Sequence, residues 1–316
     1  MGPAHRIYVG TIGEGLFRSR DSGQTFVRAA DGMFVECHVR ALVVHPHDPR
    51  VLYLGSEQGL FVTRDGADNW ARVEGPLHGK QIWSILLSPT DPDVILVGTC
   101  PAAIFRSTNA GRTWSEAHTH MLQQCPRIMG TRVTTLLQET SEILWAGVEI
   151  DGLHRSRDGG ATWEKVAVQG LSSADIHALV KVNGNFLAAT NNGLNRGDGV
   201  NWQTLPIKDI LPWVYCRALS QPCARPDVVL LGNGDGPPGS AGIIARSGDA
   251  GHTWAPAAMP QRANSTIWNF AVHPADPNLI YASSVSGQLY RSWDQGQSWE
   301  KLPREFGEIR ALAWTV

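Results

Sequence analysis

No stretch of the sequence comes near the roughly 20 consecutive apolar residues that a helix needs to cross a bilayer. The opening residues, MGPAHRIYVG, lack the basic and apolar segments of a secretory signal, and Arg6 stands where a myristoylation motif has Ser or Thr. Excess positive charge is also missing, since the formal net charge is −2. A basic surface for nucleic acid or for an anionic membrane is therefore not indicated. We expect neither a nucleic acid nor a membrane among the partners of this chain.

Cysteine is too sparse and too irregular for a disulfide framework. Five cysteines, an odd number, are spread over 316 residues without a repeated spacing. Free thiols in a reducing compartment are the simplest explanation. Together with the missing secretory signal, this predicts a cytoplasmic protein.

Segments with helical periodicity are missing as well, and an internal repeat takes their place. An octapeptide with a hydroxyl residue first, Asp or Asn third and an aromatic residue last occurs six times, and a degenerate seventh copy keeps only its second Gly and its Trp. The copies, each with the number of its first residue, are SRDSGQTF (19), TRDGADNW (63), STNAGRTW (107), SRDGGATW (156), NRGDGVNW (195, the degenerate copy), SGDAGHTW (247) and SWDQGQSW (292). Neighbouring copies begin 39 to 52 residues apart. The chain therefore comprises seven similar supersecondary units.

Each unit contains four short β-rich segments separated by turns that are rich in Pro, Asp and Gly. The unit at 39–75, for example, reads VRALVVHP, HDPR, VLYLGSEQ, GLFV, TRDGADNW and ARVEG. Seven units of four strands predict an all-β fold, a seven-bladed β-propeller of four-stranded blades. We expect residues 1–316 to form a single propeller domain.

The two ends of the chain supply complementary parts of one blade. RIYVGT at 6–11 corresponds to the second strand of a unit, whereas EIRALAWTV at 308–316 corresponds to the first. We therefore expect residues 309–316 to complete the blade begun by residues 6–30, with the C-terminal strand pairing with the N-terminal blade. Such a closure would leave no exposed sheet edge.

The octapeptide resembles the bacterial neuraminidase repeat (BNR), or Asp-box, with the pattern S-x-D-x-G-x-T-W, and the resemblance extends over nearly the whole chain. In Asp-box propellers this peptide is the turn between the third and fourth strands of a blade. The resemblance therefore implies a structural task for the boxes. The Asp accepts hydrogen bonds from its own turn, the Gly permits a positive φ, and the aromatic residue packs between blades.

Asp-box propellers include sialidases, xyloglucanases, sortilin-type receptors and photosystem II assembly factors, and this chain matches none of these subfamilies throughout. Sialidases, for example, are six-bladed and carry an Arg-Ile-Pro motif, where this chain has Arg6-Ile7-Tyr8. Sialidases also hold three arginines over a carboxylate at a comparable location. The resemblance implies a sialidase-like superfamily and leaves the activity open.

The face opposite the boxes collects the loops that lead into each first strand, and two insertions, at 115–130 and 232–242, fall on this face. When the first strands VRAL, IWSI, VTTL, IHAL, CRAL, IWNF and IRAL are aligned, their second residues form a ring at the axial mouth. The ring consists of Arg40, Trp83, Thr134, His177, Arg217, Trp268 and Arg310. Arg presents a planar fork to carboxylate or phosphate, and Trp offers a stacking face to a sugar. We predict that the arginines and tryptophans of this ring bind substrate, although the same arginines would also suit ion pairs between blades.

Titratable residues near the mouth are candidates for acid–base catalysis, in which a pKa close to neutrality is effective. We predict catalytic tasks for His177, for Glu149 or Asp151, and for Tyr215. His154 replaces the Phe of the equivalent GLF segments and is expected to be an interior residue. Other carboxylates belong to the same face, but the sequence does not reveal their distances around the ring. They are Glu14, Glu36, Glu57, Asp175, Asp235 and Glu308.

One loop on this face carries residue types that bind metals. His118, His120 and Cys125 lie in the insertion at 115–130, and Cys37-His38 and Cys100 belong to the same face. However, His-x-His is common in loops, and the remaining ligands would come from separate blades. We therefore predict no cofactor and no metal site, with this loop as the place where a metal would bind if one did.

These observations predict a pocket at the axial mouth that binds a small anionic or sugar-like molecule. In the first hypothesis the protein is a hydrolase or lyase, with the ring arginines holding the anion and a carboxylate or His177 transferring the proton. In the second hypothesis it is a non-catalytic scaffold or assembly factor that binds another protein through the same face. The fold does not distinguish these two functions, because propellers perform both.

Overall fold

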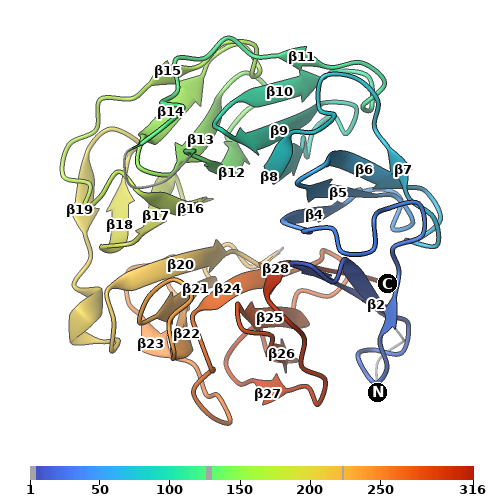
Figure 1. Cartoon of the computed structure of the whole chain (residues 1–316). Coiled ribbons are helices and arrows are strands. Elements are labelled where there is room, and N and C mark those ends of the chain that lie inside the picture. Colours follow the sequence, from blue (N-terminus) through green and yellow to red (C-terminus); the bar gives the residue numbers. More distant parts are fainter. Residues whose placement is uncertain (1–4, 126–129, 223) are drawn as a thin grey trace.

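Seven blades surround a central axis (Figure 1). The computed structural model describes residues 5–125, 130–222 and 224–316. Each blade is a sheet of four strands, and neighbouring strands within a blade are antiparallel. The prediction of an all-β, seven-bladed propeller with four-stranded blades is confirmed.

The four strands of each blade follow one another from the axis outward. Blade 1 contains β28 (Ile309–Thr315), β1 (Arg6–Thr11), β2 (Leu16–Ser19) and β3 (Val27–Arg28); blade 2 contains β4 (Ala41–Val44), β5 (Leu52–Ser56), β6 (Gly59–Thr63) and β7 (Ala71–Arg72). Blade 3 contains β8 (Gln81–Leu87), β9 (Ile95–Cys100), β10 (Ile104–Ser107) and β11 (Ser115–Glu116); blade 4 contains β12 (Val133–Gln138), β13 (Leu144–Val148), β14 (Gly152–Ser156) and β15 (Glu164–Lys165). Blade 5 contains β16 (Ile176–Val182), β17 (Asn185–Thr190), β18 (Gly193–Gly197) and β19 (Trp202–Thr204), and a short 3-10 helix, η1 (Ile207–Asp209), follows it. Blade 6 contains β20 (Tyr215–Ser220), β21 (Val229–Gly234), β22 (Gly242–Ser247) and β23 (Ala255–Pro256); blade 7 contains β24 (Ile267–Ala271), β25 (Ile280–Ser284), β26 (Leu289–Ser292) and β27 (Glu300–Lys301).

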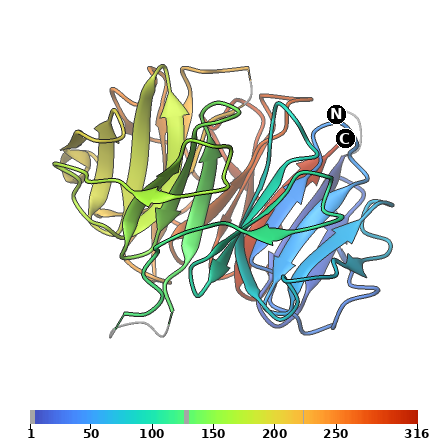
Figure 2. The ribbon, with the colours of Figure 1, turned by 90° about the horizontal axis from the view of Figure 1, so that it is seen from above.

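The ring is closed by strands from both ends of the chain. β28 pairs with β1 in an antiparallel register that runs from Arg6 opposite Thr315 to Thr11 opposite Ile309. The two ends consequently lie beside each other on one side of the ring (Figure 2). The expected closure, in which the C-terminal strand completes the N-terminal blade, is confirmed.

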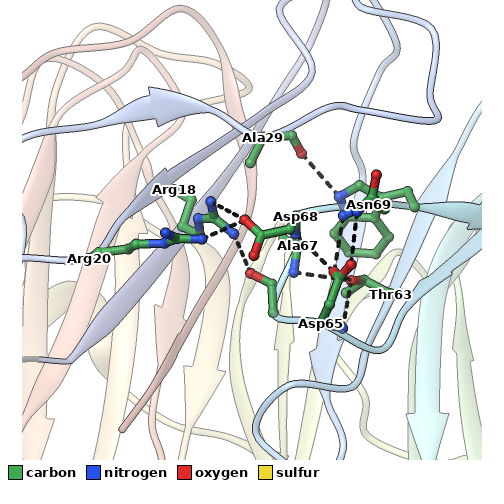
Figure 3. Close-up of polar contacts among 10 residues, drawn as sticks. Arg18, Arg20, Ala29, Thr63, Asp65, Ala67, Asp68 and Asn69 are labelled. Carbon is green, nitrogen blue, oxygen red and sulfur yellow. Dashed lines mark hydrogen bonds and ion pairs between the residues drawn. The ribbon is translucent and has the colours of Figure 1, made fainter.

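Each regular box forms the turn between the third and fourth strands of its blade. In the second box (Figure 3), Asp65 accepts the N–H groups of Asp68 and Asn69 at 2.9 and 3.0 Å, and the Thr63 hydroxyl donates to Asp65 at 2.7 Å. The box Trp70 is 4 % exposed and packs against Tyr8 of the preceding blade. The turn is therefore held by its own side chains, and its aromatic residue fills the space between two blades.

The fourth residue of the box connects neighbouring blades. It has a positive φ in six boxes, and its carbonyl oxygen accepts a hydrogen bond from the preceding blade. We call this contact the interblade clamp. The donor is an arginine of the third strand in five clamps and a tyrosine in the sixth. The clamps are Arg18 to Gly66 (2.5 Å), Tyr53 to Ala110 (3.4 Å), Arg106 to Gly159 (2.8 Å), Arg196 to Ala250 (2.9 Å), Arg246 to Gln295 (3.0 Å) and Arg291 to Ser22 (2.9 Å). Figure 3 shows the first clamp, in which Arg18 and Arg20 also bind Asp68 of the next box.

The degenerate box of blade 5 has a shorter turn and no clamp among the described residues. Gly197 pairs directly with Trp202, and Asp198 accepts the N–H groups of Val200 and Asn201. Asp198, the fourth residue of this copy, is not among the residues with a positive φ. Arg155, which occupies the clamp position of blade 4, binds Glu164 of its own blade at 3.2 Å. Where the box sequence degenerates, the contact between the blades therefore changes.

Buried apolar residues form one cluster at each of the seven interfaces between blades, so the core is distributed around the ring. In the described part of the chain, no helix is long and apolar enough to cross a membrane. The arrangement leaves the innermost strands, rather than a central hydrophobic core, facing the axis.

Candidate functional site

A β-bulge marks the ring position on six of the innermost strands. The register of β8 against β9 shifts between Ile82 and Ser84, which leaves Trp83 as the extra residue. A bulge takes one residue out of the ladder and changes the direction of its side chain, often at the rim of a barrel or beside an active site. The ring inferred from the aligned strands is thus also a ring of bulges. The other extra residues are Thr134, His177, Arg217, Trp268 and Arg310.

The ring surrounds a cavity of about 840 Å³ at the axial mouth, which we call the axial cavity. Six of the seven predicted ring residues line it, together with Arg132, Glu149, Asp175 and Tyr215. A smaller hollow of about 220 Å³ shares the six ring residues and is also lined by Thr134. The six ring residues of the axial cavity are Arg40, Trp83, His177, Arg217, Trp268 and Arg310.

Trp83 contacts two arginines. The guanidinium carbon of Arg40 lies 4.7 Å from the centroid of the Trp83 ring, and that of Arg132 lies 4.4 Å away. Arg40 leads into blade 2 and Arg132 into blade 4, so the two guanidinium groups reach Trp83 of blade 3 from its two neighbouring blades. Arg132 also binds Glu149 at 2.9 Å, whereas Arg40 donates to the ring nitrogen Nδ1 of His38 at 3.3 Å.

Trp268 contacts two arginines in the same way on the other side of the ring. The guanidinium carbon of Arg217 lies 3.9 Å from the Trp268 centroid, and that of Arg310 lies 4.2 Å away. Arg310 forms an ion pair with Glu308. Trp83 and Trp268 line the axial cavity, and each already has two guanidinium groups against its ring. Their contacts instead orient the guanidinium planes, which differs from the stacking task that the sequence predicted.

Two of the four arginines have no acidic partner. Among the described residues, neither Arg40 nor Arg217 forms an ion pair with a carboxylate. Burial lowers the pKa of both groups, and the charge of Arg310 lowers it further. Nearby acidic groups oppose this shift, namely Glu57 and Glu308 at Arg40, and Tyr215, Glu149 and Asp175 at Arg217. Partly buried cations that repel one another are stabilised by an anion placed between them. The axial cavity therefore has the electrostatic character of an anion site.

Arg132 is a cavity residue that sequence reasoning missed. The aligned first strands place Thr134 in the ring, but the Thr134 hydroxyl donates to the carbonyl oxygens of Ile176 and Gly147, at 2.6 and 3.0 Å. The residue that reaches the mouth is Arg132, two positions earlier. Residues two apart on a strand share a face, so the pattern R-x-T at the start of this strand was the available signal.

His177 is buried, and its hydrogen bonds define its tautomer. Nδ1 lies 2.7 Å from the carbonyl oxygen of Cys216, and because a carbonyl only accepts, Nδ1 carries the proton. Nε2 then points toward Asp175, whose Oδ2 lies 3.6 Å away. Burial and the charge of Arg217 lower the pKa of His177, while Asp175 opposes this shift. The neutral imidazole therefore presents an unprotonated nitrogen beside a carboxylate.

Glu149 and Tyr215 also line the cavity, and their pKa values are shifted toward the neutral forms. Burial raises the pKa of Glu149, the charge of Asp175 raises it further, and the charge of Arg132 opposes both effects. Burial raises the pKa of the Tyr215 phenol, whose ring centroid lies 4.9 Å from that of His177. Glu149 is accordingly suited to donate a proton, and Tyr215 remains an uncharged hydroxyl group.

Asp151, which the sequence suggested as an alternative to Glu149, does not line the axial cavity. Its carboxylate binds His154 at 2.9 Å, Lys165 at 2.6 Å and the N–H of Leu122 at 2.9 Å. These partners hold the pKa of Asp151 well below its usual range, despite its burial. We therefore assign Asp151 to the structure of blade 4, and His154 is the buried interior residue that the sequence indicated.

The loop with metal-binding residue types does not assemble a site in the described part of the chain. His118 and His120 pack edge to face with ring centroids 5.2 Å apart. No three side chains of His, Cys, Asp or Glu among the described residues are close enough together to hold a metal ion. Cys125 is a free thiol, and burial raises the pKa of Cys37 to about 12. Cys100 reaches the wall of the axial cavity.

The other carboxylates of this face have partners or stand apart from the ring. Asp235 lines the cavity, but its oxygens accept the N–H groups of Ser240 and Ala241. Glu57 accepts the N–H of His38 at 2.7 Å. Only Glu149, Asp175 and Asp235 are carboxylates of the described residues that line the axial cavity.

Comparison with known proteins gives distant matches. A family model described as "Sortilin, neurotensin receptor 3" matches residues 14–143. The curated xyloglucanase Xgh74A of Acetivibrio thermocellus is 20 % identical over 337 aligned residues, which cover 88 % of this chain and 38 % of the xyloglucanase. The chain thus spans about two fifths of that relative.

Two solved structures share the fold over nearly their whole length. YCF48 from Cyanidioschyzon merolae is 15 % identical with a TM-score of 0.58, and the match covers 84 % of this chain and 85 % of that one. YCF48 bound to D1 peptide is 17 % identical with a TM-score of 0.60, and the match covers 89 % and 87 %. At these identities the likeness shows the fold alone.

Proposed function

We propose that the axial cavity of this Asp-box propeller binds a small anionic or sugar-like molecule and that the protein acts on this molecule as a hydrolase or lyase. One observation carries the proposal. Arg40 and Arg217 enter the cavity without a carboxylate partner, and a tryptophan face orients each of them. A ligand carboxylate or phosphate would supply the missing charge through two parallel hydrogen bonds per guanidinium. Because each tryptophan ring already contacts two guanidinium groups, we favour the anionic ligand over a sugar that needs to stack.

The proposed chemistry uses two neighbouring groups of the cavity. His177 Nε2 takes a proton from the substrate or from an attacking water, and Asp175 stabilises the imidazolium that forms. Glu149, whose pKa is raised, gives a proton to the leaving group. Arg40 and Arg217 hold the anionic group of the substrate in place. The 20 % identity with a xyloglucanase supports a hydrolase in general.

Turnover of chromogenic substrates in matched variants tests this proposal. We expect the purified chain to cleave at least one of a series of 4-nitrophenyl phosphates, carboxylate esters and glycosides, or xyloglucan oligosaccharides. His177→Asn and Glu149→Gln should abolish that turnover while the melting temperature changes little. Asp151→Asn is the matched control, because it removes a carboxylate of the same blade that does not line the cavity. Turnover that persists in His177→Asn and Glu149→Gln would overturn these assignments.

A non-catalytic scaffold is the second candidate, and a separate observation favours it. Large apolar side chains are exposed in the loops that lead into the innermost strands, on the face of the axial cavity. This is the face on which a protein partner would bury apolar surface around a charged centre. The YCF48 propeller bound to a peptide supports a protein ligand in general. The exposed residues are Phe34, Val35, Leu122, Ile210 and Val214.

A peptide-binding experiment distinguishes the two candidates. If the protein is a scaffold, immobilised protein should capture acidic peptides with a dissociation constant that Phe34→Asp and Val35→Asp weaken, and no substrate of the series should be cleaved. If it is an enzyme, these two surface variants should cleave substrate at the wild-type rate. The expected cytoplasmic location stays a prediction that fractionation of the producing cells would test.

A further inference from the structure

Blade 5, like blade 6 with its pair of Ala245 and Pro256, lacks the large pair of side chains that fills the outer part of most other blades. On the third strand this position is usually aromatic, and the residue opposite on the fourth strand is long and charged. In blade 5 the pair is Asn195 and Thr204. Asn195 is completely buried, and its side chain is smaller than the aromatic side chains at the same position in blades 1, 2, 3 and 7. The corresponding pairs are Phe17 with Arg28, Phe61 with Arg72, Phe105 with Glu116, and Tyr290 with Lys301.

A hollow of about 510 Å³ lies over blade 5 beside Thr204, and we call it the blade-5 hollow. Its two hydroxyl groups, of Ser172 and Thr204, already have a partner in Asn195, whereas Asn192 and Lys208 add an amide and a charge to the wall. The Ser172 hydroxyl accepts from the Asn195 amide at 2.9 Å, and the Thr204 hydroxyl donates to it at 3.0 Å. The remaining wall is largely aliphatic. The lining residues are Ser172, Asn192, Gly193, Thr204, Leu205, Pro206, Ile207, Lys208 and Val214.

The blade-5 hollow adjoins the axial cavity. Val214 lines both and is 41 % exposed, so it presents an apolar side chain where the two meet. Asn191 of the axial cavity is followed directly by Asn192 of the hollow. A ligand whose anionic group lies at Arg217 can therefore extend outward over Val214.

We propose that the ligand of the axial cavity is an amphipathic anion whose aliphatic chain lies in the blade-5 hollow. This inference rests on the proposed anion site and adds the chemical class of the ligand. Two observations favour an aliphatic chain over a sugar chain. None of the lining residues of the hollow is aromatic, whereas sugar subsites use aromatic platforms, and the hydroxyl groups in the wall already have partners.

A homologous series of alkyl carboxylates tests the proposal directly. Binding of acetate, butanoate, hexanoate and octanoate to the full chain is measured by titration calorimetry. Each methylene group that enters an apolar site is expected to raise the affinity about fourfold. We therefore expect the dissociation constant to fall steadily from butanoate to octanoate.

Filling the hollow should remove this chain-length dependence. Thr204→Arg restores the residue found opposite the aromatic position in blades 1 and 2, and its long side chain would occupy the hollow. Gln203→Arg is the matched control, because it adds the same charge one residue away, on the other face of β19. In Thr204→Arg, octanoate should bind no more tightly than butanoate, whereas Gln203→Arg should retain the wild-type series.

The outcomes separate this inference from the proposed function. If every carboxylate binds with the same affinity, and Arg217→Gln removes this binding, the anion site stands and the aliphatic tail is refuted. If affinity rises with chain length equally in Thr204→Arg and in the wild type, the chain lies elsewhere and the hollow is refuted. If no carboxylate binds to the folded protein, the anion site itself is refuted.

Discussion

Arginines stand at both faces of this propeller, and their surroundings differ. At the box face, Arg246 of blade 6 donates to the carbonyl of Gln295 in the next blade, and four other arginines do the same at their own interfaces. At the mouth of the same blade, Arg217 lies on the ring of Trp268 and has no ion pair with a carboxylate among the described residues. The first arrangement satisfies its donors within the fold, and the second leaves them for a ligand.

The repeat explains why the two faces differ. The box has the same task in six of the seven blades, so its residues recur at those turns, including the αL residue whose carbonyl accepts the clamp. A ligand at the axis contacts each blade once and differently, so the residues that meet it cannot repeat. Function in this fold is thus expected where the repeat breaks, and structure where it holds.

The largest effect that we expect is unfolding in acid, because protonation of the box carboxylates removes hydrogen bonds that hold the turns of the box face. Hydrogen bonds from Thr25 hold the pKa of Asp21 at about 2, and those from Thr253 hold Asp249 at about 2. A carboxyl group whose pKa is depressed in the folded state stabilises the fold above its unfolded pKa, near 4, and this contribution is lost as the pH falls toward 2. We expect the melting temperature to fall steeply between about pH 4 and pH 2.

The third box supplies the control for this prediction, because it carries Asn109 in place of Asp. Asp249→Asn copies it and should make the fall in melting temperature between pH 4 and pH 2 shallower. Circular dichroism melts at intervals of half a pH unit would measure both curves. A variant whose acid transition is as steep as that of the wild type would show that the boxes do not govern it.

A pair of substitutions in blade 6 tests the comparison itself. Arg217→Gln should weaken binding of inorganic phosphate or octanoate by about 10- to 100-fold, since a charge-assisted hydrogen bond contributes about 1.5–3 kcal/mol. It should leave the melting temperature unchanged or higher, because the repulsion from Arg310 is relieved. Arg246→Gln should do the reverse, lowering stability by about 1–2 kcal/mol with unchanged binding. Calorimetric titration and thermal melts of both variants measure this, and equal effects on binding would remove the distinction between the faces.

The fold was predictable from the sequence because every blade repeats the same box at a similar spacing. The ring positions were predictable for the same reason, since aligned strands place equivalent residues at equivalent heights. What the alignment could not reveal was the direction of each side chain. Thr134 turns to a backbone carbonyl, Arg132 replaces it at the mouth, and Asp151 turns to Lys165.

The tryptophans illustrate a second limit of the sequence. The alignment of the first strands places Trp83 and Trp268 at the mouth, but it does not reveal that each contacts two arginines. One partner comes from the blade before and the other from the blade after. Such contacts depend on the geometry of the closed ring, which a strand alignment does not contain. The order of the seven ring residues becomes informative only when neighbouring blades are placed side by side.

The contribution of Glu149 to the stability of the fold should change with pH in the opposite direction to that of the box aspartates. Burial raises its pKa in the folded state, so the folded protein binds the proton more tightly than the unfolded chain does. Its contribution to stability is therefore greatest below its unfolded pKa, near 4.3, and is lost as the pH rises through the raised value. Glu149→Gln should remove this loss and narrow the difference in melting temperature between pH 4.5 and pH 7. Asp151→Asn should instead lower the melting temperature at pH 7, because the pKa of Asp151 is depressed and its ion pairs are lost.

The smallest effect that we expect is a difference in the free energy of unfolding between a variant at a regular box interface and a variant at the interface with the degenerate box. Arg106 and Arg155 occupy the same position in neighbouring blades, but only Arg106 has an αL carbonyl to bind, at Gly159. Arg106→Gln should lower the free energy of unfolding by about 1 kcal/mol, as expected for a partly buried hydrogen bond. Arg155→Gln should cost less than about 0.5 kcal/mol, since its partner Glu164 is largely exposed and surface ion pairs contribute little. Urea unfolding of the two variants, at equal m-values, measures the difference. Equal losses would mean that the clamp stabilises the blades through packing of the arginine side chain rather than through the carbonyl that the box provides.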